Sequence, residues 1–94
     1  MSYFDNILTF VRVYELGNMS SAARDMRISA AVASSRISQL EEHLGVRLFQ
    51  RTTRVLNPTE QGNIFYPNAQ KILDAVAVAE AEINEVTLVP RGII

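Results

Sequence analysis

Two short helical patterns follow each other in this chain with almost no residues between them, and this spacing constrains the fold more than any other feature. A serine stands where each helix needs its first cap: Ser20 opens one pattern and Ser29 opens the other. A hydroxyl at such a position accepts a backbone N–H of the first turn and stabilises the helix by about 1 kcal/mol. Only Arg27 and Ile28 remain as connector. Helices joined by so short a turn cross at a large angle, so a helix-turn-helix is predicted.

The helix predicted after Ser29 has an apolar side and a side of small residues. At about 100° per residue, the apolar positions fall on one side, which should pack inward: Ala33, Ile37, Leu40 and Leu44. The opposite side carries methyl groups and hydroxyls, from Ala30, Ala31, Ser34, Ser35 and Ser38. Such a face fits a DNA major groove about 12 Å wide, where methyls meet thymine and hydroxyls meet base edges or phosphates. A polar face that meets only solvent is the alternative.

A polar segment with two arginines follows this helix. Short apolar segments at Leu48–Phe49 and Val55–Leu56 flank it, which predicts two very short β-strands around a tip. Guanidinium groups such as those of Arg51 and Arg54 suit phosphates or the negative potential of a narrow minor groove. The alternative is a solvated loop whose arginines serve solubility.

These motifs occur in one order: S-S-A-A-R, then V-A-S-S-R-I-S, then L-E-E-H-L-G-V-R-L-F-Q-R-T-T-R, then P-T-E-Q-G and a long helix. From Phe4 to about Ile83 this order resembles the amino-terminal DNA-binding domain of LysR-type bacterial transcription regulators. The resemblance implies a mainly α, dimeric winged helix-turn-helix: a three-helix core with a short β-hairpin wing, followed by a long dimerisation helix.

The resemblance also implies which residues meet DNA. Ala30, Ala31, Ser34 and Ser35 would face bases, with Arg51 and Arg54 serving the wing. Arg36 points to one side of the serine face and is assigned to a phosphate. The predicted DNA-binding set is completed by Ser20, Ser21, Ser29, Ser38, Thr52 and Thr53.

Two positions depart from the habit of the family. Ala30 stands where glutamine is most often found, and Ser35 where arginine or histidine often follows the helix serine. Neither side chain forms the bidentate pairs with guanine or adenine that are worth about 1 to 3 kcal/mol of discrimination. Base reading by this helix should therefore be modest, and thymine methyls, the wing and DNA shape should supply more of the specificity.

A long last helix is predicted from Thr59, its cap, to about Glu85. Its apolar stripe holds a heptad spacing through Phe65, Ala69, Ile72, Val76, Ala79, Ile83 and Val86. Such a repeat is the seam of a coiled coil, and it is longer than a core of three short helices could bury, so the helix is expected to pair with a second copy. Packing of the stripe inside the chain is the alternative. Pro67 predicts a kink or a late restart of the helix.

The first helix is predicted over Tyr3 to Leu16, with a left-handed stop at Gly17. Its core positions at helical spacing are Phe4, Ile7, Leu8, Val11 and Tyr14. The expected organisation is a winged helix-turn-helix over 1–58, a dimerisation helix over 59–86, and over 87–94 the start of a hinge. In the family resembled, such a hinge leads to an effector-sensing domain.

Charge is segregated along the chain although the net charge is −1. Residues 20–57 hold six arginines against three acids, which gives +3, and the rest holds three basic residues against seven acids, which gives −4. Phosphate contacts supply most nonspecific DNA affinity, and a basic reading head is suited to them. Chance fluctuation in a small chain is the alternative.

Catalysis, metal binding and membrane insertion have little support in the sequence. There are no cysteines, His43 is the only histidine, and Glu41 and Glu42 are adjacent on a helix and do not converge as an acid/base pair. No cofactor is expected. The chain has no long apolar run, so no membrane partner is expected and a cytoplasmic location is the default.

Two functions of different class fit these observations. The favoured one is a sequence-specific double-stranded DNA-binding domain that dimerises through its last helix and reads an inverted-repeat operator. A small-molecule effector would act only through a domain outside this chain. Oligomers larger than a dimer are an option for the full-length protein. The other is a helical adaptor module that binds a protein partner and does not contact DNA.

Overall fold

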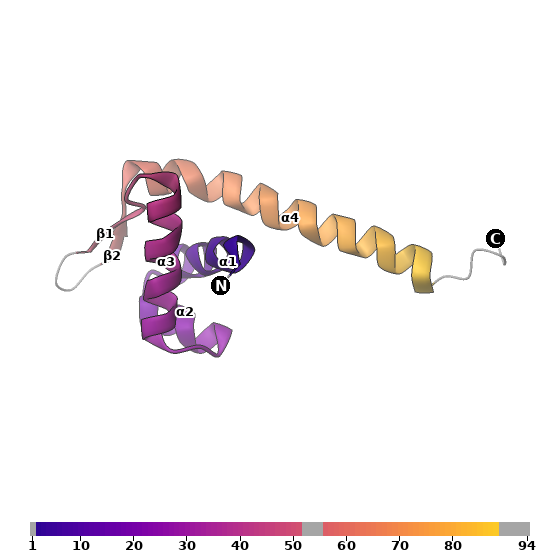
Figure 1. The fold of residues 1–94 in the computed structure, drawn as a ribbon, viewed down its shortest axis with the longest axis horizontal. Coiled ribbons are helices and arrows are strands. Elements are labelled where there is room, and N and C mark those ends of the chain that lie inside the picture. Colours follow the sequence, from indigo (N-terminus) through magenta and orange to yellow (C-terminus); the bar gives the residue numbers. More distant parts are fainter. Residues whose placement is uncertain (1, 52–55, 89–94) are drawn as a thin grey trace.

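The computed structural model describes residues 2–51 and 56–88. Three helices form a head, a two-stranded hairpin projects from one side of it, and a long fourth helix leads away from it (Figure 1). The elements in chain order are α1 (Tyr3–Leu16), α2 (Met19–Met26), α3 (Ala30–Leu44), β1 (Phe49–Arg51), β2 (Leu56–Pro58) and α4 (Glu60–Leu88).

The helix-turn-helix is confirmed, and one of its two predicted caps is wrong. The Ser29 hydroxyl caps α3 as expected and accepts the backbone N–H of Val32 at 3.1 Å. Helix α2 instead begins at Met19, and its cap is Asn18, whose side-chain oxygen accepts the N–H of Ser21 at 2.9 Å. Asparagine caps helices as well as serine does, and Asn18 has the extended backbone that a cap needs, so Ser20 falls inside the first turn.

The turn between α2 and α3 depends on a left-handed residue. Arg27 adopts φ 60° and ψ 43°, and the N–H of Ile28 closes the turn on the carbonyl of Ala23 at 2.9 Å. A non-glycine residue in this conformation costs roughly 1 to 2 kcal/mol. The head therefore holds its two helices through a strained but hydrogen-bonded turn.

Phe10 of α1 lies at the centre of the core. It is fully buried, and its ring contacts those of Phe49 and Phe65 at centroid distances of 5.4 and 5.3 Å. The first helix has the predicted bounds, and Gly17 takes the left-handed stop at φ 69°. Phe4 was expected in the core but is 39% exposed, because helical spacing does not reveal how far the neighbouring helices extend along α1.

The hairpin confirms the two short strands around a tip. The strands pair antiparallel, with Phe49 opposite Pro58 and Arg51 opposite Leu56. Pro58 has no N–H to donate and lies at the end of a strand in a two-stranded sheet, where proline is tolerated. The predicted tip, Gln50 to Arg54, is wrong at its start: Gln50 and Arg51 belong to β1 and pair with Asn57 and Leu56, because backbone pairing continues past the apolar residues. The rest of the tip, with Val55, lies outside the described residues.

Helix α4 begins where predicted and runs through Pro67 without a break. The Thr59 hydroxyl accepts the N–H of Gly62 at 3.0 Å. Gly62 lets the helix approach the chain before β1 closely, since a Cβ there would lie 2.2 Å from the carbonyl oxygen of Leu48. The late restart is wrong: Glu60 to Leu88 form one helix, in which a proline removes only one backbone donor.

Candidate nucleic-acid interface

The two-sided character of α3 is confirmed. Ala33, Ile37 and Leu40 are fully buried, and the half-buried Leu44 packs against the core. On the other side four of the five predicted residues are exposed and Ser34 is half-buried, the exposed ones being Ala30, Ala31, Ser35 and Ser38. This side of α3 therefore presents only short side chains to a ligand.

Arg36 lies on the flank of this face. Its guanidinium donates to the hydroxyl of Thr9 in α1 at 3.3 Å, and the residue is half-buried. Thr9 is fully buried and donates in turn to the carbonyl of Asp5 at 2.8 Å. Arg36 therefore ties α3 to α1, and its contact with a DNA phosphate stays a prediction.

The serines predicted to contact DNA from the helix starts differ in exposure. Ser20 in the first turn of α2 and Ser29 before α3 are exposed, and Ser21 is half-buried. The Ser29 oxygen accepts a helix N–H, which leaves its own O–H available as a donor. Their contacts with DNA stay a prediction. Thr52, Thr53 and Arg54 lie outside the described residues, as does the side chain of Arg51.

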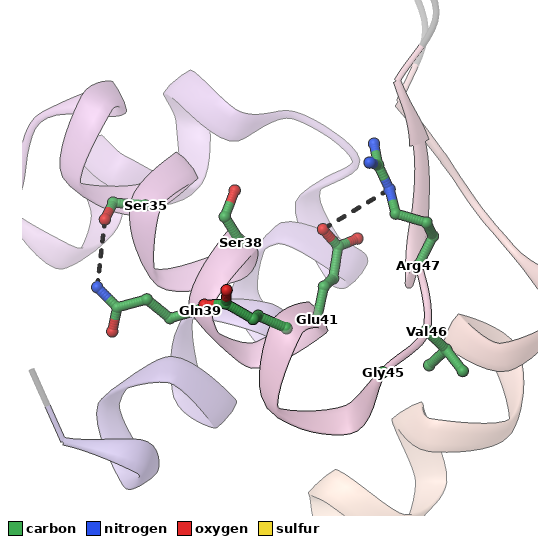
Figure 2. A pocket seen from close by; sticks show the side chains of 8 residues that line it. Ser35, Ser38, Gln39, Glu41, Gly45, Val46 and Arg47 are labelled. Atoms are coloured by element: carbon green, nitrogen blue, oxygen red, sulfur yellow. Dashed lines mark hydrogen bonds and ion pairs between the residues drawn. The ribbon is translucent and has the colours of Figure 1, made fainter.

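A buried carboxylate holds the base of the hairpin against α3. Glu41 is 7% exposed and accepts the backbone N–H groups of Leu48 at 2.8 Å and Phe49 at 3.3 Å. Arg47 lies 3.8 Å from the same carboxylate (Figure 2). The predictions from the sequence do not include a contact between Glu41 and the hairpin. The signal was its place four residues after Ile37, on the buried stripe, where a charge must have partners.

A shallow cleft lies between the exposed side of α3 and the segment of residues 45–47 that joins α3 to β1. Its volume is about 560 Å³, and Ser38 and Arg47 stand on its two sides (Figure 2). The Arg47 side chain is 65% exposed. Ser35 on the helix side accepts a hydrogen bond from Gln39 at 3.3 Å. Arg47 is thus a cation beside the predicted DNA-binding face that the predicted set did not include.

The apolar stripe of α4 divides into two parts. Ala69 is fully buried and Phe65 packs against the core, so for these two residues the alternative of packing inside the chain is correct. Further along, the stripe is open to solvent: Ile72 is 39% and Ile83 is 64% exposed. Ala79 is exposed, Val76 is half-buried, and the side chain of Val86 lies outside the described residues.

The described residues hold no group of three or more histidine and acidic side chains placed to bind a metal ion. His43 is exposed and lies against the ring of Tyr3, with centroids 4.6 Å apart. None of the described helices is both long and apolar enough to cross a membrane.

Residues 4–63 match the model of the family described as bacterial regulatory helix-turn-helix proteins, lysR family. The chain belongs to the LysR family. It is 39% identical over 90 residues to the HTH-type transcriptional regulator CrgA of Neisseria meningitidis, covering 96% of this chain and 30% of CrgA. It is 42% identical over 92 residues to an HTH-type transcriptional regulator of Haemophilus influenzae, covering 98% and 32%. This LysR-family chain thus spans about a third of the length of these relatives.

Solved structures of LysR-family DNA-binding domains share its fold. The BenM DNA-binding domain in a complex with catB site 1 DNA superposes with a TM-score of 0.86 at 30% identity, covering 93% of this chain and 96% of that one. The CbnR DNA-binding domain in a DNA complex gives 0.85 at 29% identity, covering 93% and 99%. The predicted winged helix-turn-helix is therefore confirmed, and with it membership of a family of DNA-binding transcription regulators.

Proposed function

We propose that this chain binds specific double-stranded DNA sequences as the reading head of a LysR-type regulator. The exposed side of α3 would enter the major groove, and the hairpin would lie beside it on the backbone or in the minor groove. The observation that carries the proposal is the pairing of an accessible small-residue helix face with a hairpin fixed to its side by Glu41. The DNA complexes of BenM and CbnR, which have the same fold, support it.

Specificity would come from several weak contacts. Ala30 and Ala31 offer methyl groups to thymine, and Ser35 and Ser38 offer hydroxyls to bases or phosphates. Arg36, Arg51 and Arg54 keep their predicted roles, and Ser20, Ser21, Ser29, Ser34, Thr52 and Thr53 complete the proposed contact set. We add Arg47, because its exposed guanidinium stands across the cleft from Ser38. The specificity of a DNA-binding domain with such contacts depends strongly on DNA shape.

The chain is proposed to dimerise through the exposed part of the α4 stripe, at Ile72, Val76, Ala79 and Ile83. Two heads joined in this way would meet the two halves of an inverted-repeat operator, spaced by about one helical turn of DNA, 34 to 36 Å, or a multiple of it. Residues 1–58 would be the reading head, 59–86 the pairing helix and 87–94 the start of a hinge. A small-molecule effector would act through a further domain of a longer, cytoplasmic protein.

Fluorescence anisotropy with duplexes selected from genomic fragments tests the DNA proposal. The logarithm of the affinity should fall linearly with the logarithm of salt concentration, with a slope of about −0.9 for each phosphate contact. Arg54→Ala and Arg47→Ala should each reduce that slope by about 1 on every sequence. Ser35→Ala should weaken binding only to the selected sequence.

Lys71→Ala is the matched control, since it removes one exposed positive charge from α4, outside the proposed contact set, and should leave the slope unchanged. A chain that binds no duplex even at low salt would refute the proposal. Its exposed α4 stripe would then favour the adaptor function instead.

A further inference from the structure

A cluster of hydrogen-bonded side chains joins the end of α1 to the first turns of α4. The rings of Tyr14 and Tyr66 stack with centroids 4.0 Å apart and planes 8° from parallel. The Tyr14 hydroxyl donates to the side-chain oxygen of Asn63 at 2.7 Å, and the Tyr66 hydroxyl donates to the carboxylate of Glu15 at 2.5 Å. Gln70 donates to the Tyr66 oxygen at 3.0 Å. We call these five residues the tyrosine brace.

The hydrogen bonds of the tyrosine brace lie along the edge of the core, beside the buried line of α4. Asn63, Tyr66 and Gln70 follow one another at spacings of three and four residues and so form one line along the helix. Phe65 and Ala69 form a second line beside it, and this line packs against the core together with the ring of Tyr66. Apolar contacts are non-directional, whereas hydrogen bonds and ring stacking fix an orientation. The two lines together prevent α4 from rolling or tilting on the head.

The brace also crosses the point where the backbone of α4 is weakest. Pro67 has no N–H, so the helical hydrogen bond that would end on the carbonyl of Asn63 is missing. The hydrogen bond from Gln70 to Tyr66 links the turns on either side of this gap. The hydrogen bond to Glu15 raises the pKa of Tyr66 to about 12, because loss of the proton would remove the donor of this bond.

Beyond the brace, α4 extends from the head as a lever. Residues 74–85 are exposed, apart from the half-buried Val76. From Tyr66 to Ile83 the helix rises by about 25 Å, so a tilt of about 10° at the brace moves Ile83 by about 4 Å. That displacement exceeds the rise of about 3.4 Å along the DNA axis from one base pair to the next. Small angular errors at the brace would therefore move a paired head by one base pair.

We propose that the tyrosine brace sets the angle between the reading head and α4, and that Tyr66 and Glu15 thereby determine which half-site spacing a dimer of this chain accepts on DNA. The proposal rests on the proposed function, because it needs both duplex binding and pairing through α4. Tyr66 and Glu15 are positioning residues: they act through the direction of a helix and need no contact with DNA.

Binding to duplexes with two half-sites tests this role. The separation between the half-sites is varied one base pair at a time, and a duplex with one half-site serves as reference. The unmodified chain should prefer one separation. In Tyr66→Phe, which keeps the stacked ring and loses the hydrogen bonds, the preference over the neighbouring separation should fall about fivefold or more, as expected when a bond to a charged acceptor is lost. Affinity for the single half-site should not change.

Two further variants separate this role from a general loss of stability. Glu15→Gln keeps an acceptor for the Tyr66 hydroxyl and should retain part of the preference, whereas Glu15→Ala should behave like Tyr66→Phe. Tyr3→Phe is the control, because it removes a hydroxyl from an exposed ring that lies against His43 and not against α4. If Tyr66→Phe weakens half-site binding as much as two-site binding, or leaves the preference intact, the proposal is refuted.

A distance measurement tests the angle without DNA. The chain contains no cysteine, so Glu42→Cys on α3 and Glu82→Cys on α4 give two unique positions for spin labels. Labelled chains are diluted with unlabelled ones so that only distances within one chain are seen. The distribution should be narrow in the unmodified chain and broader with Tyr66→Phe. An unchanged distribution refutes the brace itself, whereas failure to bind duplex with a broadened distribution refutes the proposed function and the spacing role with it.

Discussion

Removing the Glu41 side chain should destabilise this domain far more than removing the neighbouring acid. Glu41→Ala leaves two backbone donors, the N–H groups of Leu48 and Phe49, without their acceptor. Both residues are at most 1% exposed, so water cannot easily replace the carboxylate. A buried donor left unsatisfied costs about 1 to 3 kcal/mol, which gives about 2 to 6 kcal/mol for the pair.

That loss is a large part of the 5 to 15 kcal/mol that holds a typical domain together. Urea denaturation followed by circular dichroism measures it directly. Glu42→Ala is the matched control: it removes the same charge from an exposed position on the same helix and should change the free energy of unfolding by less than about 0.5 kcal/mol. Arg47→Ala should cost less than about 1 kcal/mol, because its ion pair with Glu41 is long and mostly solvated.

DNA binding provides a second measurement on the same variant. At a temperature where Glu41→Ala is still folded, its hairpin is no longer fixed to α3, so affinity for duplex should fall while the salt slope keeps most of its value. If the free energy of unfolding of Glu41→Ala lies within 0.5 kcal/mol of the unmodified chain, then the carboxylate does not hold the hairpin in the way we describe.

Three further predictions concern α4. Gly62→Ala should lower the melting temperature, because its Cβ would collide with the Leu48 carbonyl oxygen and the strain of about 1 to 3 kcal/mol exceeds the gain in helix propensity of about 1 kcal/mol; an unchanged melting temperature in calorimetry would contradict the close approach. The pKa of Tyr66 is raised above its ordinary value of 10.0 to about 12 by its bond to Glu15, so this bond stabilises the fold fully below pH 10, and the stabilisation is lost as the pH rises to about 12. Tyrosinate absorbance should show a late-titrating step that disappears in Tyr66→Phe, and a titration without this late step would argue against the bond. Ile83→Asp should yield monomers in sedimentation without loss of the folded head, since this side chain is 64% exposed; a persistent dimer would place the pairing surface elsewhere.

Local signals in the sequence predicted local structure well. The cap at Ser29, the buried stripe of α3 and the stop at Gly17 each depend on residues within one or two helical turns. The start of α2 was wrong by two residues, because Asn18 and Ser20 are both competent caps and only the backbone conformation decides between them. The short strands were predicted from apolar residues on either side of a polar segment, and the register is set by pairing that the sequence does not show.

What the sequence could not show was which surface covers which. The heptad stripe of α4 is continuous in the sequence, yet Ala69 lies under the chain's own core while Ile83 is exposed. The same limit applies to Glu41, whose partners are backbone N–H groups that any residue could have supplied. The predicted DNA-binding face of α3 is placed as expected, and contact with bases remains to be measured.

The exposure of α4 beyond Leu73 links its order to protein concentration. A helical segment of about 15 residues is only marginally stable in water when nothing packs against it. By mass action, pairing would supply the missing stabilisation, and dilution would withdraw it. The far end of α4 should therefore fray as the solution is diluted while the head stays folded, so that ellipticity per residue becomes a direct titration of self-association.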